Sequence, residues 1–192
     1  MGIALSTGGS GSGHPSVKLR NVNDWCDLAV VDVDTQAPAY VYGTNPPQRA
    51  MTLDGKPKTQ DKVTAVVVNP GTAVVTVDGQ DRGIEAGEIV TVWFQGRDRW
   101  DGDTDRAKAK GSPKSWRGAQ DDHGTLMVGD IFRWHFTGTE QGRGAEPRKL
   151  RLVVIRSPKP EEQAIKERCE ELHRAATSTP VAASTAPAPE PF

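Results

Sequence analysis

Two tryptophans lie in a polar, basic stretch of the sequence, residues 97–124, and each has arginine or lysine within two residues. Aromatic rings such as those of Trp100 and Trp116 stack on unpaired bases, and nearby cations neutralise phosphates, whereas a duplex hides the faces of its bases. The stretch therefore favours a single-stranded nucleic acid as ligand. From these residues alone an alternative stays open, in which both tryptophans cover the edge of a small core and the cations only solvate the loop.

The formal net charge of −1 conceals an uneven distribution. Residues 1–94 carry 7 basic and 10 acidic side chains, residues 95–160 carry 14 and 9, and residues 161–192 carry 3 and 6. Seven of the eleven aromatic residues also lie in the basic part or at its border, between Trp93 and Phe136. Because phosphate binding depends on local positive charge, the basic middle points to a nucleic acid, although a solvated loop of mixed charge also fits the charges alone.

Candidate catalytic and metal-binding groups are few. Asp32 and Asp34 are two residues apart on a predicted strand and so share a face, and Asp121, Asp122 and His123 form a second cluster. Neither has the third carboxylate or the spaced histidines that would complete a metal site. The sequence also lacks a Gly-x-Ser-x-Gly turn and a cysteine–histidine arrangement suited to nucleophilic catalysis. We expect a protein that is not an enzyme and uses no metal or cofactor.

The cysteine usage and hydropathy bear on the compartment. Cys26 and Cys169 are far apart and have no CxxC partner, which fits a reducing cytoplasm. Apolar runs stay well below the ~18 residues that a membrane span needs. The first residues lack the basic and then apolar pattern of a secretory signal. We expect a cytoplasmic protein without a membrane partner.

Runs of β-branched and alternating residues predict the elements that position these side chains. The predicted strands are residues 25–34, 39–42, 63–68, 72–77, 89–94, 131–136 and 150–155. Asn69, Pro70 and Gly71 predict a hairpin-like turn. Because strands and helices do not alternate along the chain, we expect a mainly all-β fold class. The predicted architecture is a small OB-like antiparallel barrel, closed or partly open, with one C-terminal helix and disordered termini.

Two of these strands resemble each other, each preceded by glycine and an acid. Alternation predicts that one set of side chains faces the core and the other set faces away from it. The core set is Val90, Val92, Phe94, Phe132, Trp134 and Phe136; the outward set is Thr91, Trp93, Arg133 and His135.

The C-terminal part predicts one helix, Pro160 to Ala176, with Pro160 in its first turn. Glu162 with Lys166 is a favourable pair on that helix. A narrow stripe of Ile165, Cys169 and Leu172 could dock on the barrel or on a second subunit. The expected organisation is a flexible arm (1–20), an OB-like domain (21–160) with the long basic loop 97–124, the helix (161–176) and a disordered tail (177–192).

The tail ends in Pro191-Phe192, an aromatic side chain with a terminal carboxylate that partners can bind together. With this end, a low-complexity linker and an OB-like domain, the sequence resembles the bacterial single-stranded-DNA-binding proteins. It is also similar to OB-fold single-strand binders encoded by actinobacterial phages, over residues 132–140 and 147–150. This tail has Glu190 where tails of that family carry several acids.

The resemblance implies a non-enzymatic protein that coats and protects single-stranded DNA in phage or bacterial replication, recombination and repair. It implies replication and recombination enzymes as partners of Pro191 and Phe192, and it allows a homo-oligomer. The residues expected to contact DNA are Trp93, Arg97, Arg99, Trp100, Lys108, Lys110, Lys114, Trp116, Arg117, Arg133, Arg148, Lys149 and Arg151. The alternative is a phage structural protein, a capsid-decorating or tail-associated β-barrel that binds no nucleic acid.

Overall fold

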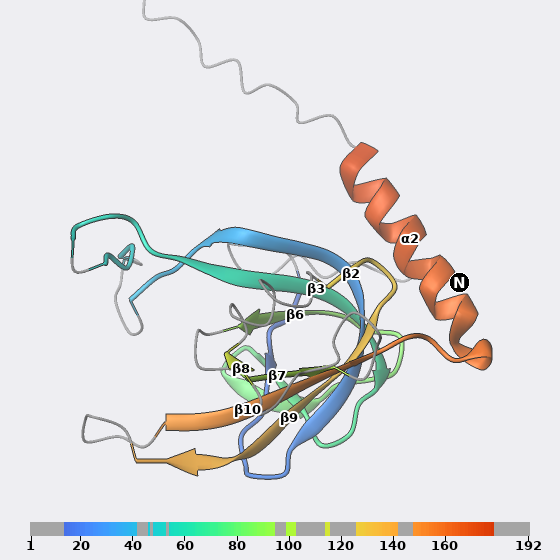
Figure 1. The fold of residues 1–192 in the computed structure, drawn as a ribbon, viewed down its shortest axis with the longest axis horizontal. Coiled ribbons are helices and arrows are strands. Elements are labelled where there is room, and N and C mark those ends of the chain that lie inside the picture. Colours follow the sequence, from blue (N-terminus) through green and yellow to red (C-terminus); the bar gives the residue numbers. More distant parts are fainter. Residues whose placement is uncertain are drawn as a thin grey trace, which may run out of the picture.

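The structure is a computed structural model, and it describes residues 14–41, 46, 48–52, 54–94, 99–102, 114–115, 126–141 and 148–178 (Figure 1). Over these residues the chain is mainly β with one C-terminal helix, as the sequence predicted. The elements are β1 (Val17–Lys18), β2 (Trp25–Pro38), β3 (Thr59–Asn69), β4 (Val74–Val77), β5 (Gln80–Gly83), β6 (Ile89–Phe94), β7 (Arg99–Gly102), β8 (Lys114–Ser115), β9 (Ile131–Glu140), β10 (Arg148–Arg156), the 3-10 turn η1 (Pro160–Glu162) and α2 (Gln163–Ser178).

A large sheet has the strand order β6-β3-β2-β9-β10-β7-β8, and its ladders are antiparallel except the parallel pairing of β10 with β7. β2, the third strand in this order, has 14 residues and pairs with β3 over most of its length. Only its first part, Trp25 to Ala29, also pairs with β9. Three register shifts interrupt the β2–β3 ladder, and such bulges bend a strand. The bend is plain in Figure 1, where the blue strand curves around the core.

A small second sheet has the order β1-β4-β5. Asn69-Pro70-Gly71 therefore does not close a hairpin, because β3 and β4 belong to different sheets. The turn itself is present, but Gly71, at a φ of +51°, packs against Trp25. The next residue is tied to that same Trp25, since the Thr72 N–H donates to its carbonyl over 3.0 Å. These contacts with β2 direct the chain away from β3.

The predicted alternation is confirmed on β6 and β9. All six residues predicted to face the core are buried among the side chains that fill the space between the two sheets. Trp93, Arg133 and His135 lie on the opposite face of the large sheet, which we call the outer face. Thr91 lies there too, yet it is buried because the N-terminal segment runs along β6: the Thr91 N–H donates to Pro15 over 2.9 Å and Ser16 forms a parallel bridge with Thr91.

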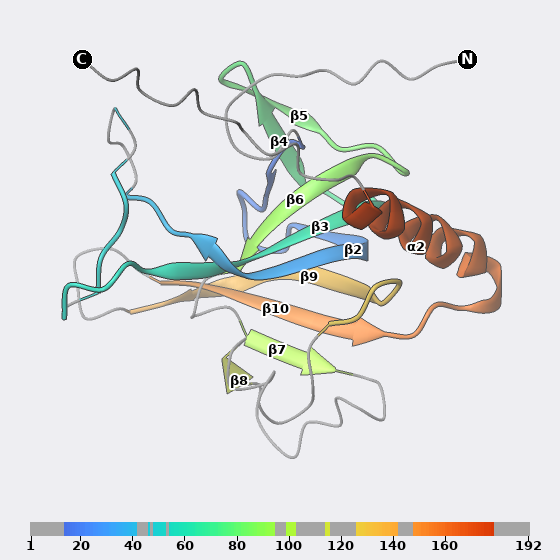
Figure 2. The same ribbon diagram turned by 90° about the horizontal axis from the view of Figure 1, so that it is seen from above.

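The C-terminal helix docks on the outer face, which confirms one of the two alternatives for its apolar stripe (Figure 2). Cys169 is fully buried, and with Ile165 and Leu172 it packs against Ala29, Val31, Val66 and Ile131. The Arg168 guanidinium donates to the Gly87 carbonyl over 3.2 Å, which fixes the helix near the start of β6. No helix in the described part of the chain is long and apolar enough to span a membrane.

Two expectations about this region change. Glu162 pairs with Arg156 at the end of β10, with Nη2 at 2.7 Å from Oε1, and not with Lys166, whose ammonium lies 3.9 Å from Glu170. Residues 14–20, placed in the flexible arm, contain β1, and Val17 and Leu19 are buried in the core. The stretch 97–124 contains β7 and β8; most of it, the first 13 residues and residues 179–192 lie outside the described residues.

Candidate nucleic-acid interface

A tryptophan and a lysine share the outer face of β3 and β6 near one end of the sheet. Trp93 and Lys62 are direct cross-strand partners, and the Lys62 ammonium lies 6.0 Å from the centre of a Trp93 ring. Both side chains are half-buried, so each keeps exposed surface. The α2 helix covers Val66 and contacts Ile89 further along the same two strands, which leaves the Lys62–Trp93 end uncovered by the helix.

His14 directly precedes the segment that runs parallel to the edge of β6. The hydrogen bond of Pro15 to Thr91 and the bridge of Ser16 hold the segment that follows His14 against the edge of β6. The imidazole is half-buried. Its burial, and then the positive charge of Lys62, lower the pKa of His14 from its ordinary value. His14 is therefore neutral around pH 7 in the free protein.

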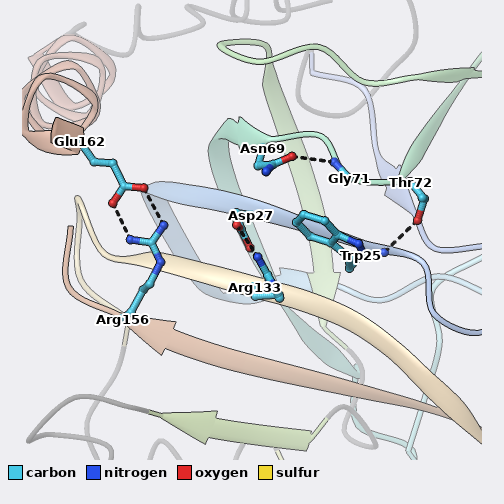
Figure 3. A network of polar contacts seen from close by, with 8 residues as sticks. All are labelled: Trp25, Asp27, Asn69, Gly71, Thr72, Arg133, Arg156 and Glu162. Atoms are coloured by element: carbon cyan, nitrogen blue, oxygen red, sulfur yellow. Dashed lines mark hydrogen bonds and ion pairs between the residues drawn. The ribbon is translucent and has the colours of Figure 1, made fainter. Parts of the chain in front are cut away.

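Arg133 also lies on the outer face, but an acid already holds it (Figure 3). Its Nε and Nη2 donate to the two carboxylate oxygens of Asp27 over 2.7 and 2.9 Å, and these bonds raise the pKa of Arg133. The guanidinium carbon lies 4.1 Å from the centre of a Trp25 ring, and Gly71 packs against Trp25 as well. Asp27, Arg133 and Trp25 thus brace β2 against β9.

Lys149 and Arg151 lie on the other face of the sheet. Arg151 is the cross-strand partner of Phe136, which is buried in the core. The Arg151 guanidinium carbon lies 5.5 Å from a Trp134 ring, and the Lys149 ammonium lies 5.5 Å from the Phe136 ring. These two cations therefore cover aromatic residues at the edge of the core.

The structure does not bring the predicted contact residues into one group. Trp93 and Arg133 share the outer face, but β3 and β2 separate their strands, and Lys149 and Arg151 lie on the opposite face. The backbones of Arg99, Trp100, Lys114 and Arg148 lie in β7, β8 and β10, without described side chains. The remaining predicted residues lie outside the described part: Arg97, Lys108, Lys110, Trp116, Arg117, Pro191 and Phe192.

The connection between β2 and β3, residues 39–58, which we call the β2–β3 arm, holds none of the residues predicted to contact DNA. Its described residues form short bridges between Tyr40 and Arg49 and between Met51 and Pro57. Tyr40 is 54% exposed and Met51 is 53% exposed, beside the exposed cations Arg49, Lys56 and Lys58. The sequence feature that could have identified this arm is its aromatic content, since both tyrosines of the chain, Tyr40 and Tyr42, fall in this one connection.

The acidic residues do not form a metal site in the described part of the chain. Asp32 and Asp34 share the outer face as predicted, but Asp32 lies 3.5 Å from His173 and Asp34 accepts a hydrogen bond from the Gln36 N–H over 2.8 Å. The described residues hold no group of three metal-ligating side chains. Asp121, Asp122 and His123 lie outside them.

Comparisons with protein-family models, with curated proteins and with solved structures found no match to this chain. Its function must therefore be inferred from its own residues and the arrangement of its strands.

Proposed function

We propose that this protein binds and coats single-stranded DNA without catalysis, through the outer face of β3 and β6. The observation that carries the proposal is the position of Trp93 and Lys62 in the strand order. Numbered among themselves, the five long strands β2, β3, β6, β9 and β10 lie in the order 3-2-1-4-5. OB-folds bind oligonucleotides on the face of their strands 2 and 3, and here those strands are β3 and β6.

The far edge of the sheet supports an OB-like, partly open barrel. β7 begins five residues after β6 ends, and it pairs in parallel with β10, from Arg99 opposite Leu152 to Gly102 opposite Ile155. The chain that leaves β6, the third long strand, thus pairs through β7 with β10, the fifth long strand. The described residues contain no ladder that joins β6 directly to β10.

The loops of the sheet support the same face. OB-folds also contact oligonucleotides with the loop between strands 1 and 2 and the loop between strands 4 and 5. The β2–β3 arm holds the first of these positions, and the adjoining ends of β9 and β10 project at the same end of the molecule, away from α2 (Figures 1 and 2). Tyr40 and the arm's cations continue the combination of aromatic and positive groups.

In this proposal a base stacks on Trp93 while Lys62 contacts a neighbouring phosphate. One stacked base contributes ~1–3 kcal/mol, and every phosphate contact makes the affinity depend on salt. The 97–124 stretch follows β6 and adds stacking by Trp100 and Trp116 with phosphate contacts by its cations. The chain end at Pro191 and Phe192 recruits replication or recombination enzymes.

Titration of tryptophan fluorescence with a poly-dT oligonucleotide, and with a duplex of equal length, tests the proposal. We expect single-strand binding that weakens as salt rises, and a Trp93→Ala variant that binds about 5–150-fold more weakly, the equivalent of ~1–3 kcal/mol. Lys62→Ala should reduce the slope of log K against log salt by about 0.7. Arg174→Ala, an exposed cation on α2, is the matched control and should leave both quantities unchanged.

Two results would contradict the proposal: absence of single-strand binding at low salt, or equal affinity for the duplex. A protein indifferent to both oligonucleotides but present in purified virions would instead support the phage structural role.

A further inference from the structure

We propose that the β2–β3 arm of one molecule docks on the solvent-facing side of α2 of a second molecule, so that copies of this chain associate head to tail. The inference goes beyond the proposed function, because the contact joins two protein surfaces and needs no DNA. It assigns a partner to the exposed apolar side chains of the arm.

The arm exposes large apolar side chains to solvent. Tyr40, Val41 and Met51 make up half of the six exposed large apolar residues in the described part of the chain. Backbone pairing holds them in place, as the Val41 N–H donates to the Gln48 carbonyl over 2.8 Å and Met51 forms a bridge across the arm. Apolar groups gathered in one exposed place and rimmed by polar ones mark an interaction surface.

Cations rim this apolar group. Arg49 is the cross-strand partner of Tyr40, and Arg49 and Lys58 are exposed and make no ion pair with any residue that the structure describes. Lys56 lies 3.5 Å from Asp54, the one acid of the arm. Three cations against one acid leave the arm positive, so two arms repel each other. The charge therefore favours an acidic partner surface over a second arm.

The solvent-facing side of α2 offers that surface. Opposite the buried Cys169, its exposed charges are Glu167, Glu170 and Glu171 against Arg174. Glu167 and Glu171 are one helical turn apart and, among the described residues, neither has an ion-pair partner. Like charges at this spacing destabilise a helix. Cations from a second molecule remove that cost.

The two surfaces lie at opposite ends of the molecule, since both views place α2 at one end and the arm at the other (Figures 1 and 2). In the contact, Arg49 and Lys58 pair with Glu167 and Glu171 while the apolar side chains of the arm pack on the helix beside them. Each contact leaves one free arm and one free helix, so the association repeats along a row of copies. Such a row suits a protein that coats a strand.

Sedimentation velocity of the full chain without DNA, over a range of protein concentrations, tests the inference. We expect the wild type to associate at low salt and to dissociate as salt rises, because ions screen the charges. Two double variants reverse the charges: Arg49→Glu with Lys58→Glu on the arm, and Glu167→Lys with Glu171→Lys on α2. Each alone should associate at least about tenfold more weakly, because like charges then face each other.

An equimolar mixture of the two double variants should restore association, since every arm then meets a helix of opposite charge. This rescue also shows that both variants fold. Asp78→Lys with Glu85→Lys is the matched control, because it reverses two exposed acids that flank β5 and alters the net charge as much as the α2 variant does. It should associate like the wild type.

The inference is overturned if the wild type stays monomeric at low salt, if either reversed variant associates as the wild type does, or if their mixture stays dissociated. These results are separable from the proposed function. A monomeric wild type that binds a dT oligonucleotide overturns the head-to-tail contact alone, and an associating protein that binds no single strand refutes the proposed function alone.

Discussion

Replacing Arg133 with alanine tests whether this arginine stabilises the sheet or contacts DNA. The sequence placed it among the residues expected to contact DNA, whereas the structure pairs it with Asp27, whose side chain is 9% exposed. The pair joins the first part of β2 to β9, and the guanidinium stacks on Trp25. We therefore expect Arg133→Ala to reduce stability and to leave DNA affinity within about threefold of the wild type, because Asp27 already neutralises the charge.

The magnitude follows from the exposure of the two partners. The substitution removes two charge-assisted hydrogen bonds and leaves a nearly buried carboxylate without them, but Arg133 itself is 48% exposed and water can reach the site. We expect a loss of about 2–4 kcal/mol in the free energy of unfolding, below the full cost of breaking a buried ion pair. For a domain of this size that corresponds to roughly 4–16 °C in the midpoint of thermal unfolding.

Thermal unfolding of single and double variants provides the measurement. Asp27→Ala with Arg133→Ala should destabilise by about 1–2 kcal/mol less than the sum of the single effects, since no carboxylate is left unpaired. Arg20→Ala is the matched control: Arg20 makes a similar pair with Asp81, at 2.7 Å, but Asp81 is 36% exposed and the loss should stay below ~1 kcal/mol. An unchanged midpoint for Arg133→Ala, together with a tenfold loss of DNA affinity, would refute the reasoning.

Three further substitutions test the packing described above. Gly71→Ala should destabilise by at least ~2 kcal/mol more than Gly79→Ala: both glycines have positive φ, but a Cβ at Gly71 would overlap the Trp25 carbonyl and one at Gly79 meets no atom within 4 Å. Equal losses in denaturant unfolding would contradict that packing. The pKa of Glu162 is about 2, so its pair with Arg156 stabilises the fold above the unfolded pKa of ~4.3 and is lost as the pH falls towards 2. Glu162→Gln should therefore be less stable than the wild type at neutral pH and equal to it near pH 2; a difference constant with pH would count against the pair. Burial raises the pKa of Cys169 to about 11, so iodoacetamide should not label it in the native protein, and Leu172→Asp should expose it while Cys26 stays protected. Rapid labelling of Cys169 in the wild type would show that α2 does not stay docked.

Local patterns predicted what depends on neighbours in the sequence. The alternation on residues 89–94 and 131–136 identified the core side chains because each strand has one buried face, and a side-chain period of two admits no other assignment. The stripe of Ile165, Cys169 and Leu172 identified the docking face of the helix for the same reason, with the helical period.

What the sequence could not predict depends on residues that are far apart in the chain. Thr91 is buried by Ser16, and Arg133 pairs with Asp27 across 106 positions, so no local window contains both members of either pair. Glu162 is an exception: Arg156 lies only six residues before it, but in a different element, and the turn between β10 and η1 brings the two side chains together. The turn at Gly71 was recognisable, but the strand that it leads to is set by the contact with Trp25.

The exposed Tyr40 was missed for a different reason. The sequence predicts a strand over residues 39–42 and a polar loop after it, whereas β2 ends at Pro38 and Tyr40 forms only an isolated bridge with Arg49. Both tyrosines of the chain lie there, which was the feature that set this connection apart from an ordinary polar loop.

The position of β2 between β3 and β9 has a consequence for synthesis on the ribosome. Ala29 pairs with Val66 on one side and with Ile131 on the other, and Ile131 comes 102 residues after Ala29 in the chain. At about 5–20 residues per second, one edge of β2 stays without its partner for roughly 5–20 s after the strand emerges. An apolar strand with an open edge is prone to pair with other chains. Truncated chains that end before β9 should therefore aggregate. For the full chain, the yield of soluble protein should increase with chaperones or at a low growth temperature, because both protect β2 until β9 has been synthesised.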